Sequence, residues 1–174
     1  MLTFGGMRFA RGPLTLGQRI VLESLSRRGA DADHTCDTER IVPVPPGMDL
    51  TGVATAVHAL VCRHETLRTR FPPGETEQVV DGAGMLEIRL CGSVEEARTA
   101  LRTDPFDIAA EWGIRVGVVC RDDRPRTVVL FLSHLAVDTS GANLVVDDLR
   151  ALLLGVERPR PPVQPLDQAA AESR

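Results

Sequence analysis

The sequence predicts an α/β (α+β) two-layer sandwich in which a mixed sheet of about five strands carries its helices on one face. Three observations support this class. Segments with strand-like and helix-like patterns alternate along the chain. The 174 residues suit one domain or one lobe of a larger fold. Hydrophobic residues make up 43% and aromatic residues 3%, so the chain can bury a sizeable core that is mainly aliphatic.

Apolar residues at helical spacing, each set preceded by a capping residue or a turn, place the helices. Thr15, Asp49 and Ser93 carry side-chain oxygens that can accept a hydrogen bond from the first turn of a helix. Helices are predicted over residues 16–28, 50–61, 94–102 and 142–154. In the last of these, Asp147 and Asp148 are expected on the solvent-exposed face. The tail is proline-rich and then weakly helical from Leu166.

Apolar runs bounded by glycine, proline or aspartate place the strands. Strands are predicted over residues 2–11, 38–44, 67–71, 78–80, 86–90, 113–120 and 126–132. The turn residues 81–84 and 122–125 are expected to close two hairpins. A polar loop is predicted over residues 31–35.

Charge and hydropathy exclude two classes of partner. The net charge is −4 and no long run of lysine or arginine occurs, which argues against nucleic-acid binding. The longest apolar runs are far shorter than the roughly 20 residues that a membrane-spanning helix needs. We therefore expect neither nucleic acid nor membrane as a partner.

The cysteines occur singly, at Cys36, Cys62, Cys91 and Cys120. Without a CxxC pair, a zinc knuckle or a redox dithiol is not expected, and no other metal-ligand spacing is present. Reduced thiols and the lack of a recognisable secretory signal indicate a cytoplasmic protein.

The candidate functional residue is His134, which follows a buried apolar strand ending at Leu132. A histidine fixed at a strand end can hold one ring nitrogen toward a cleft, as general acid–base chemistry requires. A structural histidine is the alternative interpretation. Adjacent residues of a strand point to opposite faces, so Ser133 is not expected to act as a nucleophile activated by His134.

Several segments together resemble one family, the nonribosomal peptide synthetase condensation domain of the chloramphenicol acetyltransferase-like superfamily. The most specific is RHETLRTRF at 63–71, which matches a family motif almost completely. The others are PLTLGQR at 13–19, PFDI at 105–108 with GIRV at 113–116, SHLAVDT at 133–139, and QPLDQA at 164–169. The resemblance covers essentially the whole chain and corresponds to the N-terminal lobe of that domain.

The resemblance implies a role for each matching residue. His134 takes the place of the family's catalytic histidine, which contacts the attacking amine of an acceptor substrate. Asp138 matches an aspartate that forms a structural ion pair with an arginine, while Arg63 and His64 support the site from behind. Gln18 belongs to the first motif.

Two positions depart from the family pattern HHxxxDG. Ser133 replaces the first histidine, where a hydrogen-bonding role survives, and Thr139 replaces the glycine. A β-branched residue at a glycine position is expected to strain the turn or narrow the substrate tunnel. Both departures favour a loss of ordinary condensation activity.

The family's tunnel lies between two lobes, and residues 1–160 correspond to the first. Residues 161–174 are expected to form a proline-rich tail leading toward the second, C-terminal lobe. That lobe would have to come in trans, from elsewhere in the polypeptide, or from a second copy in a homodimer. The lobe alone should expose apolar surface.

The leading hypothesis for function is condensation-type amide or ester formation from an acyl thioester. The resemblance implies that the acyl group is carried on the phosphopantetheine of a peptidyl or acyl carrier protein, and that the chain itself binds no cofactor or metal. Two alternatives remain open. The chain is either a non-catalytic module that docks a carrier protein or tailoring enzyme, or an acyltransferase that uses coenzyme A thioesters at a site between subunits.

Overall fold

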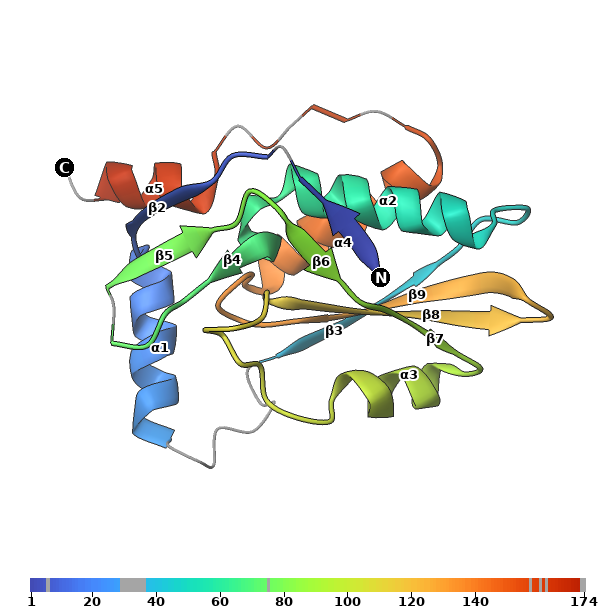
Figure 1. The fold of residues 1–174 in the computed structure, drawn as a ribbon, viewed down its shortest axis with the longest axis horizontal. Coiled ribbons are helices and arrows are strands. Elements are labelled where there is room, and N and C mark those ends of the chain that lie inside the picture. Colours follow the sequence, from blue (N-terminus) through green and yellow to red (C-terminus); the bar gives the residue numbers. More distant parts are fainter. Residues whose placement is uncertain are drawn as a thin grey trace.

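The computed structural model describes most of the chain and its side chains (Figure 1). The described residues are 1–5, 7–28, 37–74, 76–156, 158–159, 161 and 163–172. The predicted loop at 31–35 and Cys36 lie outside them.

A four-stranded mixed sheet forms the centre of the molecule. Its strand order is β3 (Thr38–Pro43), β9 (Arg124–Leu132), β8 (Ile114–Arg121) and β7 (Ile88–Cys91). β9 pairs antiparallel with both β3 and β8, whereas β7 pairs parallel with β8. The predicted mixed sheet is confirmed, with four strands rather than about five in this layer.

The hairpin between β8 and β9 turns at Asp122 and Asp123. Both residues have positive φ angles, +51° and +56°. Aspartate tolerates this left-handed region better than most residues, and two such residues in succession match the right-handed twist of the paired strands. The predicted turn here is confirmed.

The second predicted hairpin, between residues 78–80 and 86–90, is wrong. β5 (Glu77–Val80) pairs with β2 (Ala10–Pro13) and with β4 (Thr69–Arg70), while β6 (Gly84–Leu86) pairs with β1 (Leu2–Phe4). The N-terminal strands β1 and β2 pair with β6 and β5 instead of leaving them to pair with each other. Turn residues indicate only local pairings, so they do not predict pairings between segments this far apart in the sequence.

Another difference lies just before β4, because residues 67 and 68 of the predicted extended segment 67–71 belong to a helical turn of residues 65–68. They form one 3₁₀ turn, η3 (Glu65–Arg68), before the chain enters the short strand. This turn is held by the Thr69 hydroxyl, which donates to the Glu65 carbonyl at 2.7 Å.

Five helices surround the sheets in the described ranges. They are α1 (Leu16–Arg28), α2 (Leu50–Arg63), α3 (Val94–Leu101), α4 (Thr139–Leu153) and α5 (Pro165–Glu172). The predicted caps of α2 and α3 are confirmed, because Asp49 accepts from the Gly52 N–H and Ser93 from the Glu96 N–H.

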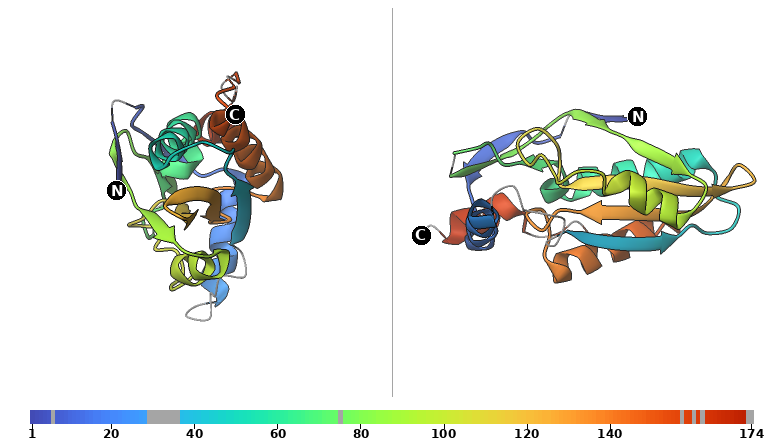
Figure 2. Two further views of the ribbon diagram at one scale, coloured as in Figure 1. Left: turned by 90° about the vertical axis from the view of Figure 1, so that its right-hand side faces the viewer. Right: turned by 90° about the horizontal axis from the view of Figure 1, so that it is seen from below.

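The central sheet is covered on both faces, which corrects the expectation of helices on one face. Val128, Leu130 and Leu132 of β9 point into the main core beneath α2 and α4, whereas Val129 and Phe131 point into a second core beneath α3. Figures 1 and 2 show α2 and α3 on opposite sides of the sheet. The continuous apolar run of β9 follows from this double burial.

The described residues 163–172 pack against the rest of the lobe. α5 lies beside β2 (Figure 1), and the Glu172 carboxylate accepts a hydrogen bond from the Leu16 N–H at 2.7 Å. Gln164 accepts from the Glu65 N–H at 3.0 Å. The described part of the segment 161–174 is therefore packed against the first helix and the RHETLRTRF segment.

Candidate functional site

A tight turn follows β9 and carries His134. The Ser133 N–H donates to the Gly113 carbonyl at 3.0 Å, and the Ser133 carbonyl accepts from the Ala136 N–H at 3.0 Å. The Ser133 hydroxyl accepts from the Leu135 N–H at 3.3 Å. Because Ser133 is 4% exposed and its hydroxyl is engaged in the turn, it fixes the backbone around His134. It shows no hydrogen bond to His134 among the described contacts.

His134 is partly exposed and lines a groove of about 350 Å³. The groove is walled by the first turn of α1, the turn after β9, the first half of α4 and the C-terminal segment. Its lining includes Gln18, His64, Thr66, His134, Asp138, Leu144, Val163 and Gln164. The structure thus brings four of the predicted site residues, Gln18, His64, His134 and Asp138, to one cavity.

Gly113 is a close-approach position beneath this turn. A Cβ added to it would lie 2.5 Å from the Ala136 Cβ, far inside van der Waals contact. We therefore expect Gly113→Ala to push the His134 turn away from β8 and to lower the free energy of unfolding by about 1–3 kcal/mol. Urea denaturation measures this. Gly5→Ala is the control, since its Cβ would meet only the Ala83 Cβ at 3.8 Å; equal losses in both variants would contradict the packing argument.

Asp138 caps α4 instead of forming the ion pair that the resemblance implies. Its Oδ1 accepts from the Gly141 N–H at 2.7 Å, and no ion pair to it occurs among the described residues. Thr139 is the first residue of α4 and has no positive φ. The expected strain at Thr139 is therefore absent, because helix N-termini accept a β-branched residue without a left-handed backbone.

The ion pair near the site is centred on Asp148, which is 2% exposed. Its Oδ2 lies 2.5 Å from Arg63 Nε and 2.8 Å from His64 Nε2, and its Oδ1 lies 2.8 Å from Arg158 Nη1. The expectation of a surface position holds for Asp147 but is wrong for Asp148. Arg63 and His64 are thus both linked to α4 through Asp148.

Arg63 also binds the C-terminal segment beside the groove, at residues 158, 159 and 164. Its Nη1 donates to the Arg158 carbonyl at 3.0 Å and its Nη2 donates to the Pro159 carbonyl. The Arg63 carbonyl in turn accepts from Gln164 Nε2 at 3.3 Å. One residue of the RHETLRTRF segment therefore anchors both ends of the described stretch that borders the groove.

Burial lowers the pKa of His64 below its ordinary value near 6.5, although Asp148 opposes this shift. The unfolded chain consequently binds a proton below about pH 6.5 that the folded chain does not. We expect the free energy of unfolding to fall as the pH drops below about 6.5, by at most about 1.4 kcal/mol per pH unit from this group. Urea titrations between pH 7.5 and 5.5 measure this slope. His64→Gln should flatten it and His58→Gln should not; an unchanged slope in His64→Gln would contradict the assignment.

Gln18 acts as a structural link at the start of α1. It forms a capping box with Thr15, in which the Gln18 N–H donates to the Thr15 hydroxyl and the Thr15 N–H donates to Gln18 Oε1. Its Nε2 also donates to Gln78 Oε1 at 3.0 Å. Gln18 therefore fixes α1, one wall of the groove, to β5.

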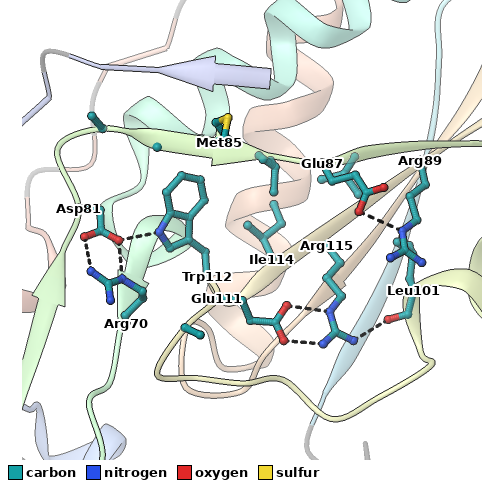
Figure 3. Close-up of a pocket in the computed structure, with 15 residues that line it drawn as sticks. Arg70, Asp81, Met85, Glu87, Arg89, Leu101, Glu111, Trp112, Ile114 and Arg115 are labelled. Carbon is teal, nitrogen blue, oxygen red and sulfur yellow. Dashed lines mark hydrogen bonds and ion pairs between the residues drawn. The ribbon is translucent and has the colours of Figure 1, made fainter. Parts of the chain in front are cut away.

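A second and larger cavity, of about 450 Å³, opens between β6 and β8 (Figure 3). Its charged side chains are already paired: Arg70 binds the Asp81 carboxylate through two nitrogens, and Arg115 binds Glu111 in the same way. Trp112 Nε1 also donates to Asp81 at 2.8 Å. His134 does not line this cavity, and its paired charges stabilise the loop before β8 rather than forming an open ionic site.

Two kinds of feature are absent from the described ranges. No helix there combines the length and apolar character that crossing a bilayer requires. No group of three or more histidine, cysteine, aspartate or glutamate side chains is placed to hold a metal ion.

The central sheet, the turn that carries His134 and the groove beside it define a protein with the condensation-domain fold. The condensation domain of the monacolin K polyketide synthase MokA superimposes with a TM-score of 0.75 at 20% identity, over 94% of this chain and 39% of that one. The teicoplanin X-domain in complex with OxyB gives a TM-score of 0.74 at 22% identity, over 98% of this chain and 39% of that one. No family model matches the chain.

Curated relatives are nonribosomal peptide synthetases. The chain is 32% identical over 112 residues to synthetase kk1B of Curvularia clavata, covering 59% of this chain and 1% of that protein. It is 31% identical over 128 residues to tyrocidine synthase 3 of Brevibacillus parabrevis, covering 70% of this chain and 2% of that protein. The chain thus spans a very small part of these relatives, and the predicted resemblance to a nonribosomal peptide synthetase condensation domain is confirmed.

Proposed function

We propose that the chain supplies the histidine-bearing half of a condensation-type acyl-transfer site. His134 carries this proposal, because a rigid turn holds it partly exposed in a groove and the motif resemblance matches it to the family's catalytic histidine. The acyl donor would be a thioester on the phosphopantetheine of a peptidyl or acyl carrier protein, and the acceptor an amine or hydroxyl.

The chemistry requires one proton acceptor near the nucleophile. The acceptor's N–H or O–H hydrogen-bonds to a His134 ring nitrogen, its nitrogen or oxygen attacks the thioester carbonyl, and a new C–N or C–O bond forms. The C–S bond breaks, and the pantetheine leaves as a thiolate that takes up the proton released by the nucleophile. His134 orients the nucleophile and can take its proton as the bond forms.

The apolar rim of the groove supports a second lobe as the missing wall. Leu144 and Val163 line the groove and are 43% and 58% exposed. Leu16 and Ile20, on the helix α1 that walls the groove, are 57% and 60% exposed. Apolar residues gathered around a cleft usually mark a contact surface. The chain also covers only 39% of the MokA condensation domain, so most of that fold lies outside it. We propose that a C-terminal lobe, or a second copy of the chain, covers this rim.

Light scattering tests this arrangement. We expect the chain to form a stable complex with a second-lobe polypeptide encoded beside it, or to form a dimer. Ile20→Glu should weaken that association at least tenfold, because it places a charge in the apolar contact. Ser26→Glu, which adds the same charge on another side of α1, is the control. If the chain is strictly monomeric and forms no complex with the second-lobe polypeptide, the proposal that a second lobe or copy covers the groove is wrong.

A non-catalytic docking module is the second candidate. It is favoured by Ser133, which engages its hydroxyl in the turn where the family has a histidine, and by the likeness to an X-domain seen in complex with OxyB. Under this alternative, His134→Ala leaves binding of a carrier protein or tailoring enzyme unchanged and no product is formed by any variant. Product formation by the wild-type chain with its second lobe decides between the two.

A further inference from the structure

His64 is buried beside the groove, and one of its two ring nitrogens has no hydrogen-bond partner among the described residues. The residue is 5% exposed, and it is one of the groove-lining residues. It terminates α2, where its N–H donates to the Leu60 carbonyl at 3.1 Å. Its backbone is therefore fixed, and the residue lines the same groove as His134.

The partner of His64 determines which ring nitrogen carries the hydrogen. Nε2 lies 2.8 Å from Asp148 Oδ2, and the same carboxylate is flanked by the guanidinium groups of Arg63 and Arg158. A carboxylate in this setting only accepts hydrogen bonds, so Nε2 must be the donor. Burial favours the neutral ring, whose pKa is lowered. A neutral imidazole protonated at Nε2 leaves a lone pair on Nδ1.

No described residue hydrogen-bonds to Nδ1 of His64. A ring nitrogen at the edge of a core usually has a hydrogen-bond partner, either in the protein or in a molecule that occupies the adjoining cavity. The charged groups that face this ring are Asp148 of α4, Arg63 of α2 and Arg158 of the C-terminal segment. Asp148 contacts Nε2, and both arginines contact the Asp148 carboxylate. None of the three therefore supplies a donor to Nδ1.

We infer that His64, oriented by Asp148, is a ligand-positioning residue whose Nδ1 accepts a hydrogen bond from a donor group of the molecule in the groove. The ligand class is one with an amine, amide or hydroxyl donor beside an apolar stem, because the remaining lining is largely aliphatic. Under the proposed function, on which this inference rests for the identity of the ligand, His134 and His64 hold the acceptor substrate from two sides. Asp148 is then a positioning residue that acts through His64.

Long-range ¹H–¹⁵N correlation spectra of the ¹⁵N-histidine-labelled chain test the orientation directly. We expect His64 to show a protonated Nε2 and an unprotonated Nδ1, and to stay neutral below pH 6.5. Alanyl-pantetheine amide, an acceptor analogue with a free amine, should then move the His64 Nδ1 resonance upfield. The ring of His58, which lies near Cys62 and away from the groove, should not move. A protonated Nδ1, or a Nδ1 resonance unmoved by millimolar analogue, would overturn the inference.

A matched pair of variants gives a second readout. His64→Gln should weaken binding of the alanyl-pantetheine amide about tenfold, the effect of losing one hydrogen bond to a fixed acceptor, while His58→Gln leaves it unchanged. If His64→Gln proves too unstable to titrate, the spectra of the wild-type chain still decide the question. The proposed function fails separately, when His134→Ala leaves product formation unchanged, so the two ideas have distinct negative outcomes.

Discussion

Replacing His134 by alanine is expected to lower the rate of amide or ester formation by about 10²- to 10⁴-fold, the usual contribution of a positioned acid–base group. The loss should appear in the turnover number, because the residue acts on the proton of the nucleophile and supplies little of the groove surface. Product formed in single-turnover reactions with an acyl-loaded carrier, followed by mass spectrometry, measures this effect.

Two controls separate chemistry from structure in this experiment. His134 is partly exposed and shows no side-chain hydrogen bond among the described contacts, so His134→Ala should unfold at nearly the same urea concentration as the wild type. His58→Ala removes a histidine outside the groove and should retain full activity. Full activity in His134→Ala would show that the residue is structural.

The largest expected loss of stability follows from replacing Asp148. Asp148→Ala leaves Arg63, whose side chain is 13% exposed, without its carboxylate partner, and it also releases Arg158 and His64. Removing one member of a buried ion pair usually costs about 3–5 kcal/mol, because an uncompensated charge stays buried. Urea denaturation at pH 7 should show a loss of this size, together with faster proteolysis after Arg158.

Asp147→Ala is the matched control, since the neighbouring aspartate has a 58% exposed side chain and, among the described residues, pairs with Arg150 alone. Such a surface pair contributes about 0–1 kcal/mol. If the two alanine variants were equally stable, the buried cluster would not be what fastens α2, α4 and the C-terminal segment together.

The elements that the sequence predicts well are those whose signals are local. The apolar run of β9, the capping residues Asp49 and Ser93, and the aspartate turn after β8 all specify their structures through neighbouring residues. The placement of His134 directly after a buried strand is predicted in the same way, and the structure has this strand and the turn that follows it. The family motifs added the condensation-domain fold, which residue patterns alone do not identify.

The features that were missed depend on contacts between distant segments. Strands β5 and β6 pair with N-terminal strands rather than with each other, and no turn residue encodes that choice. Asp148 looked like half of an acidic surface pair. The spacing from Val145 was the available signal, because a residue three positions further along a helix lies on the same face. The partner that makes its burial tolerable, Arg63, lies 85 residues away.

The most direct test is product formation by the wild-type chain, assayed with an acyl-loaded carrier protein and an amine acceptor, with and without the second-lobe polypeptide. We predict acylated acceptor from the chain together with the second-lobe polypeptide, or from a dimer of the chain, and none from the monomer alone, because we propose that a second lobe or copy completes the groove that holds His134. A stable complex that binds carrier protein yet forms no product would contradict catalysis and would support the docking module instead.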